Sequence, residues 1–492
     1  MDPDDENFPT YARAAWFFRR LLGLVYLFAF WSLATQIIGL VGHDGILPAS
    51  DYMQQVSEFT ARNAIGLDRF RLLPTLCWIS TSDAFLKALT LGGVVLATLL
   101  IVGVAPAVAL PLLWIAYLSL SVVGQDFLGF QWDALLLETG LLAIFIAPLR
   151  LRDGLNNPSD PHPLMRWLFW LLAFKLMVSS GVIKLASGDP TWRGLTAMSF
   201  HYETQPIPTP VAWYANQLPV WFQKGTTAVV IGLEMFAPFL IVFGRRARLI
   251  AFLLLAGLQI LIAITGNYAF FNLLTVAILI WLLDDRTLSR NAREDSASST
   301  PTQRSRIATA VVVLVAITTL PVSALQLARS FGIDFRGVPL VGGTARMITP
   351  FRSVNSYGLF AVMTTTRPEI IVEGSDDGIV WKAYEFRYKA GDVKRRPPWI
   401  APFQPRLDWQ MWFAALGSYG EERWFQAFCE RVLEGSADVL GLIESNPFPA
   451  SPPRLLRARL YQYHFSDRTT RQNSGAWWTS QLLGEYAPVI AK

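Results

Sequence analysis

The chain has 492 residues, of which 52% are hydrophobic and only 16% are charged. Soluble domains carry roughly 25% charged residues, so this composition indicates that lipid is the main solvent. The net charge of +5 comes from Lys and Arg residues spread over many segments. No basic stripe forms, so no nucleic-acid partner is expected, and membrane orientation explains the charge better.

Nine apolar runs approach the length of about 20 residues that a helix needs to cross a bilayer core. Open sheet edges are not tolerated in lipid, so these runs predict an all-α polytopic bundle of about nine transmembrane helices. No cleavable signal peptide is visible, and the first run is interpreted as a signal anchor. The runs are 16–41, 86–104, 105–123, 130–149, 164–186, 225–244, 248–265, 267–284 and 307–328.

Arginine residues predict how the bundle is oriented. With nine spans, four arginine-containing segments fall on one side, which the positive-inside rule assigns to the cytoplasm. Residues 329–492 then lie on the opposite side of the membrane. The arginines are Arg13, Arg19 and Arg20; Arg150 and Arg152; Arg245, Arg246 and Arg248; and Arg286, Arg290, Arg293, Arg304 and Arg306.

The composition divides the chain into a transmembrane domain, 1–328, and an extracytoplasmic α+β domain, 329–492. Residues 285–306 are rich in Ser, Thr and Arg and predict a cytoplasmic linker before the last span. In the second domain, residues 375–378 read Ser-Asp-Asp-Gly, a good hairpin turn. Residues 380–389 alternate with period two, which predicts a short antiparallel strand. Beyond Pro405 the pattern becomes helical.

Three ionisable residues lie inside predicted spans. Glu138, Lys175 and Glu234 stand on three consecutive spans at a similar estimated depth. Charge in the bilayer core is costly and usually faces a partner or a wet cavity. We therefore expect one intramembrane polar cluster, either a functional relay or a structural ion-pair cluster, and the structural interpretation is favoured.

A second set of candidates lies near the outer end of the bundle. Asp133 begins the fourth span and Lys184 ends the fifth, and the loop that follows is aromatic and rich in proline. These residues are expected to converge on a polar pocket that faces the C-terminal domain. The equally weighted alternative is an interfacial belt and helix caps. The loop residues are Trp192, His201, Tyr202 and Glu203.

Enzymatic signatures are missing from the sequence. There is no P-loop, dinucleotide fingerprint or G-x-S-x-G elbow, the four histidines are far apart, and neither a metal nor a cofactor is predicted. Cys77 and Cys429 both fall outside in this topology, so they either form one disulfide or, as favoured, stay as free buried thiols.

Several long motifs resemble the lipase maturation factor family across nearly the whole chain. The resemblance implies a protein of the endoplasmic reticulum membrane in eukaryotes, whose lumenal C-terminal domain helps secreted lipases to fold and assemble. The short termini and arginine-rich linker favour a bacterial member, with the C-terminal domain in the periplasm. The motifs are Phe130-Gln131-Trp132-Asp133 with LLLETG (135–140), SGVIKLASGDPTW (180–192), HYETQPIPTP (201–210), GNYAFFNLLT (266–275), VNSYGLFAVMTTTRPEIIVEGSDDG (354–378), WIAPFQPRLDWQMWFAALG (399–417) and NPFPASPPRLLRARLYQYHF (446–465).

The stretch SGVIKLASGDPTWRGLTAM is also similar, more weakly, to the membrane core of vitamin K-dependent γ-carboxylases and related transmembrane proteins. That resemblance implies Lys184 as a catalytic base.

The sequence therefore leaves two functions open for this protein. The favoured one is a membrane-anchored maturation factor that is not an enzyme. It contacts membrane lipid and binds exported, lipase-like clients through aromatic residues such as Trp399, Trp409, Trp412, Trp477 and Trp478. The alternative is a membrane-embedded enzyme acting on a lipid-soluble cofactor, such as a quinone, or on a lipid-soluble substrate.

Overall fold

A computed structural model describes residues 10–156, 158–289, 305–333 and 339–491. Within these ranges, seven helices are long and apolar enough to cross a membrane. They are α1 (Ala12–Ala34), α5 (Asp83–Val102), α6 (Pro106–Val123), α8 (Pro163–Ala186), α12 (Val220–Phe236, continued as a 3₁₀ helix to Val242), α13 (Arg245–Thr265) and α17 (Arg306–Ser330).

The two other predicted spans, 130–149 and 267–284, contain shorter helices. These are α7 (Gln131–Ile144) and α14 (Phe271–Leu279, followed by a 3₁₀ turn to Leu282). Most residues of both helices are buried in the protein. Irregular backbone at membrane depth is tolerated where protein rather than lipid surrounds it, so these helices can end early. The apolar composition of the runs did not reveal this.

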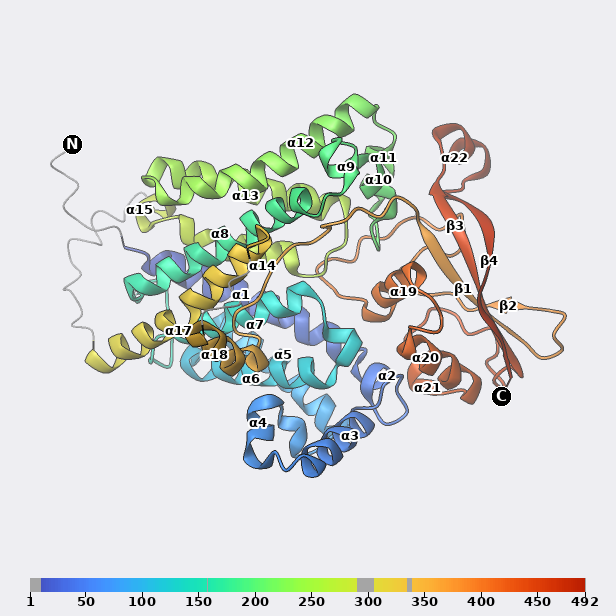
Figure 1. Cartoon of the computed structure of the whole chain (residues 1–492), viewed down its shortest axis with the longest axis horizontal. Coiled ribbons are helices and arrows are strands. Elements are labelled where there is room, and N and C mark those ends of the chain that lie inside the picture. The colour runs from blue at the N-terminus through green and yellow to red at the C-terminus, as the bar shows by residue number, and fades with distance from the viewer. Residues whose placement is uncertain (1–9, 157, 290–304, 334–338, 492) are drawn as a thin grey trace.

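The described chain nevertheless passes nine times between two ends of the bundle. Contacts between loops identify the ends, and α7 and α14 each connect one end to the other. Figure 1 shows one end near the N-terminus and the other against the C-terminal domain. The first end has the contacts Thr10–Asp285, Gly103–Asp153 and Arg245–Asp284, and the second has Gln36–Gln404, Phe127–Arg406 and Asn267–Ile400.

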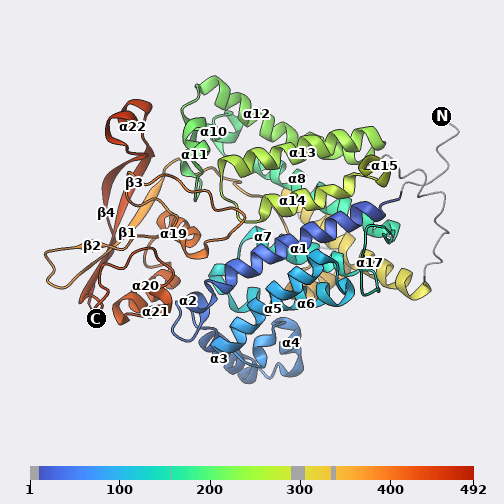
Figure 2. The ribbon, with the colours of Figure 1, turned by 180° about the vertical axis from the view of Figure 1, so that it is seen from behind.

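Smaller helices cover the two ends. α15 (Asp285–Leu288) lies at the N-terminal end, and α9 to α11 lie beside the C-terminal domain (Figures 1 and 2). Of the predicted linker 285–306, residues 290–304 lie outside the described residues, as do residues 1–9 before the first span. The remaining bounds are α2 (Ile37–Val41), α3 (Ala49–Arg62), α4 (Arg69–Leu72), α9 (Pro190–Arg193), α10 (Ala197–Thr204), α11 (Pro210–Asn216) and α18 (Pro339–Ile348).

The C-terminal domain contains a four-stranded antiparallel sheet of order β2-β1-β3-β4. Its helices α19 to α21 lie between the sheet and the bundle, as both ribbon views show (Figures 1 and 2). The strands are β1 (Pro368–Ser375), β2 (Lys382–Ala383), β3 (Leu455–Phe465) and β4 (Trp478–Ala491). The helices are α19 (Arg406–Leu416), α20 (Arg423–Glu434), α21 (Ala437–Leu440) and α22 (Arg468–Ser474). The expected α+β character is confirmed.

The predicted hairpin turn is present between β1 and β2, but the strand after it is shorter than predicted. Asp377 accepts backbone hydrogen bonds from residues 379 and 380, both at 2.8 Å. Only residues 382–383 pair as β2. Further along, the N–H groups of Tyr388 and Lys389 donate to the carboxylate of Asp408, at 2.8 and 2.9 Å. A side chain of α19 therefore takes the place of a strand partner.

One segment assigned to the outer domain lies within the bundle. We call residues 354–363 the strap. Tyr357 of the strap is only 3% exposed and its hydroxyl donates to Glu138 of α7 at 2.6 Å. The strap N–H of Met363 donates to Asp189 at 2.8 Å, and the strap carbonyl of Phe360 accepts from Trp192 at 2.9 Å. A segment on the C-terminal side of the predicted boundary at residue 329 therefore packs against the helices of the bundle.

Candidate functional site

The predicted cluster of three intramembrane residues is divided between two ion pairs. Lys175 Nζ of α8 lies 2.6 Å from Glu138 Oε1 of α7, and both side chains are buried. The other carboxylate oxygen of Glu138 accepts from the strap, from the Tyr357 hydroxyl at 2.6 Å and the Asn355 N–H at 2.8 Å. This pair therefore joins two helices and the strap.

Glu234 of α12 pairs with Lys184 instead of Lys175. Lys184 Nζ lies 2.7 Å from Glu234 Oε2 and 3.0 Å from the carbonyl of Ser180, and it lies 5.3 Å from the centre of the Trp192 ring. Lys184 is near the end of α8, whereas Glu234 is near the end of α12 that is remote from the C-terminal domain. α12 therefore starts well beyond the end of α8. The assumption that Glu138, Lys175 and Glu234 lie at one depth in the membrane was wrong.

Asp133 does not join Lys184 at a shared mouth. It forms a two-pronged ion pair with Arg406, the first residue of α19, at 2.9 and 3.0 Å, and accepts from the Tyr117 hydroxyl at 2.5 Å. All three side chains are completely buried. Arg406 was missed in the sequence, although an arginine within the apolar stretch 399–417 was a usable signal.

Glu203 also contacts the C-terminal domain instead of a pocket. Its carboxylate accepts from the N–H of Phe465 and contacts His464 Nδ1, both at 2.8 Å, at the end of β3. The carbonyl of Glu203 accepts from Arg367, which precedes β1, at 2.7 Å. Asp133 and Glu203 are thus two attachment points between the bundle and the outer domain.

The other predicted pocket residues do meet around one cavity. Lys184, Trp192, His201 and Tyr202 line a cavity of about 560 Å³, and so does Glu234 from the other predicted set. Tyr268 of the motif GNYAFFNLLT also lines it, and its hydroxyl lies 3.0 Å from His201 Nε2. Burial, helped by the positive charge of Lys184, lowers the pKa of His201 to about 4, so the ring is neutral at physiological pH.

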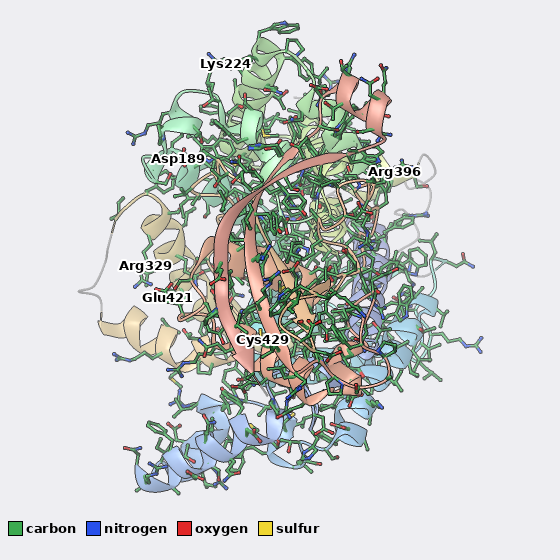
Figure 3. All side chains as sticks on the ribbon, turned by 90° about the vertical axis from the view of Figure 1, so that its right-hand side faces the viewer. Asp189, Lys224, Arg329, Arg396, Glu421 and Cys429 are labelled. Carbon is green, nitrogen blue, oxygen red and sulfur yellow. The ribbon has the colours of Figure 1, made fainter. Side chains whose placement is uncertain are left out.

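Both cysteines are free and buried, so the disulfide alternative is wrong and the favoured free thiols are found. Cys77 packs in the bundle core. Cys429 is on α20, under the sheet of the C-terminal domain, as Figure 3 shows from that end of the molecule. Burial raises the pKa of the Cys429 thiol, which makes it a core residue rather than a reactive group.

The fold and these contacts define a multi-pass membrane protein whose helical bundle is attached to a mixed α+β domain by buried charged groups. Two family models match the chain. The model for the lipase maturation factor transmembrane domain matches residues 13–290, and that for the lipase maturation factor C-terminal domain matches residues 353–488. The chain belongs to the lipase maturation factor family. The second match begins at residue 353, next to the start of the strap.

Similar curated proteins come from animals. Lipase maturation factor 2 of Gallus gallus is 36% identical over 96% of this chain and 80% of its own length. Lipase maturation factor 2 of Homo sapiens is 35% identical over 95% of this chain and 81% of its own length. Lipase maturation factor 1 of Bos taurus is 35% identical over 96% of this chain and 88% of its own length. No solved structure matches the chain. These comparisons support neither a bacterial type of the family nor a relation to the carboxylases.

Proposed function

We propose that this protein is a membrane-anchored maturation factor that assists the folding or assembly of exported, lipase-like proteins. The observation that carries the proposal is the similarity to proteins named lipase maturation factors over 95% or more of this chain, through both domains. The enzyme alternative has no comparable support. Lys184, its expected base, is the ion-pair partner of Glu234 in this structure.

We place the client-binding surface on the C-terminal domain, at the free edge of β4. This strand pairs with β3 on one side, and among the described residues no strand covers its other edge. Leu482, Leu483 and Val489 of β4 are about half exposed (48%, 55% and 50%). An uncovered edge with apolar side chains can add a further strand from an extended, incompletely folded chain.

Most of the tryptophans expected to contact a client do not have the required exposure. Trp399 is 54% exposed, and the other four are buried in the domain. Their burial fits a structural role, so of the five tryptophans only Trp399 remains a candidate, beside the β4 edge. The clients fold outside the cytoplasm, so we place this domain in the lumen of an endoplasmic reticulum membrane or the equivalent compartment.

A secretion assay tests the proposed client surface. Cells that lack their own maturation factor would express this protein together with a secreted lipase, and lipase activity in the medium would be measured. Leu482→Lys with Leu483→Lys should lower secreted activity several-fold, because charges at the edge disfavour strand addition. Ile379→Lys, at an 82% exposed apolar residue of the same domain, is the control and should leave activity unchanged. Equal activity of all three proteins at equal expression would reject the β4 surface, and absence of rescue by the unmodified protein would reject the function itself.

A further inference from the structure

The cavity beside Lys184 has the size and the lining of a binding site for a lipophilic molecule. It lies between α8, α10, α12, α13, α14 and the strap, and its volume of about 560 Å³ is within the usual range for small-molecule sites. Its walls are mainly aliphatic and aromatic. Examples, one from each of the five helices, are Met177, Met198, Val230, Leu258 and Phe271. Such walls offer a hydrocarbon chain contacts without requiring hydrogen bonds.

The opening of the cavity faces the lipid side of two membrane helices. Trp221 and Val229 of α12 and Leu261 of α13 line the cavity and are also 73%, 55% and 61% exposed. Both helices have the length and apolar composition of membrane spans. Large apolar side chains exposed on such helices face hydrocarbon, so a molecule would enter from the membrane rather than from water.

One pair of charged groups stands out among the walls, which also carry the uncharged polar side chains of His201, Gln259 and Tyr268. Lys184 and Glu234 form a neutral pair on the cavity wall. An ammonium group has three N–H donors, and two of those of Lys184 are used by Glu234 and by the Ser180 carbonyl. Among the described residues, Glu234 Oε1 has no hydrogen-bond donor. A paired donor and acceptor with no net charge suits a hydroxyl group, whereas a phosphate would be repelled by Glu234.

We propose that this cavity binds one acyl chain of a neutral, hydroxyl-bearing membrane lipid of the diacylglycerol class, with the hydroxyl at the Lys184–Glu234 pair. The proposal goes beyond the client function and does not depend on it. The acyl chain occupies the space between α12 and α13. The lipid hydroxyl donates to Glu234 and accepts from the remaining N–H of Lys184.

Photocrosslinking in nanodiscs tests the proposal with the full-length protein. The probes are diacylglycerol and phosphatidylcholine, each carrying a diazirine on one acyl chain, and the crosslinked peptides are identified by mass spectrometry. The diacylglycerol probe should label peptides that contain residues 225–233 or 258–265, and unlabelled diacylglycerol should compete. Equal labelling of this region by both probes would identify only the general contact of lipid with the helix surface and would overturn the proposal.

Two glycines of α12 provide a matched pair of variants. Gly225 lines the cavity and Gly232 does not, and a Cβ at either position meets no heavy atom within 4 Å. Gly225→Phe places a ring at the cavity opening and should lower cavity labelling about tenfold, which corresponds to about 1.4 kcal/mol of binding free energy. Gly232→Phe should leave labelling and the melting temperature unchanged. Unchanged labelling in Gly225→Phe would reject the cavity as the binding site.

The polar end of the site is tested by removing both charges together, so that neither is left unpaired. Lys184→Met with Glu234→Met should still accept an acyl chain. It should lose the preference for the diacylglycerol probe over the phosphatidylcholine probe, measured as the ratio of the two labelling yields in the cavity peptides. A retained preference would show that the Lys184–Glu234 pair does not recognise the hydroxyl. If the double variant fails to fold, the phosphatidylcholine comparison in the unmodified protein still decides the question of head-group selectivity.

Discussion

Asp133, Glu138 and Glu234 each lie 2.6 to 2.9 Å from a basic side chain on another element. A buried charge without a partner is costly, and the charged hydrogen bonds between partners offset that cost only when the geometry is good. The pairs therefore have a structural consequence: each fixes which two elements can pack against each other. Glu138 does so three times, through α8 and two residues of the strap.

Lys175→Met should destabilise the protein strongly, because it leaves the carboxylate of Glu138 buried without its cation. The expected loss is about 3–5 kcal/mol in the free energy of unfolding. Adding Glu138→Gln should restore part of it, since the remaining group is neutral. Lys87→Met changes an exposed lysine on α5 and serves as the control. Thermal melting in detergent or nanodiscs measures all three. A double variant less stable than Lys175→Met alone would contradict the explanation.

The sequence revealed which ionisable residues need partners but not which partners they have. Glu138, Lys175 and Glu234 were recognised because they interrupt apolar runs. Which ionisable residues form ion pairs depends on how far each helix extends beyond its neighbours. The apolar runs of the sequence do not contain that information. The partner of Asp133 is 273 residues away in a different domain. The cavity was found in part, because Lys184, Trp192, His201 and Tyr202 are close in the chain, whereas Glu234 and Tyr268 come from later helices.

At the scale of whole elements, apolar length predicted the seven long helices well. The span residues of α5, α12, α13 and α17 are mostly exposed on the surface of the protein, whereas those of α1, α6 and α8 are mostly buried. α7 and α14 are enclosed by protein, and their ends are set by contacts such as that of Asp133 with Arg406. In the outer domain, residues 384–389 alternate like a strand because Tyr384 and Phe386 are buried, but their backbone partners include the Asp408 side chain.

Arg406→Met should loosen the contact between α7 and α19 more than it disturbs the rest of the outer domain. It leaves Asp133 fully buried and without its cation, which is the strongly destabilising arrangement. Hydrogen exchange should become faster in peptides covering 125–133 and 404–416, while β3 stays protected. Arg423→Met changes an exposed arginine at the start of α20 and should leave exchange unchanged. Uniformly faster exchange throughout the domain would indicate general unfolding and contradict a local role.

At the scale of the whole molecule, the arginine pattern and the nine passes lead to the same arrangement. Segments containing Arg19, Arg150 and Arg245 lie at the N-terminal end of the bundle, around Asp153 and Asp284. The C-terminal domain lies at the opposite end (Figure 1). This arrangement was predictable because the number of passes and the loop charges can both be counted in the sequence. The strap was not predicted, because its mostly apolar sequence, VNSYGLFAVM, is too short to span a membrane and does not show which helices it contacts.

Single introduced cysteines determine which compartment each end faces. Leu149, at the arginine-rich end, is 96% exposed and Ile379, in the outer domain, is 82% exposed, whereas the native Cys77 and Cys429 are 3% and 1% exposed. Background labelling of the folded protein should therefore be low. In sealed microsomes whose cytoplasmic face is outward, a membrane-impermeant maleimide should label the Leu149→Cys protein directly. It should label the Ile379→Cys protein only after the membrane is permeabilised. Labelling of both variants in intact microsomes would place the two ends in one compartment. That result would require an even number of membrane crossings between residues 149 and 379 and would contradict the five passes that lie between them, made by α8, α12, α13, α14 and α17.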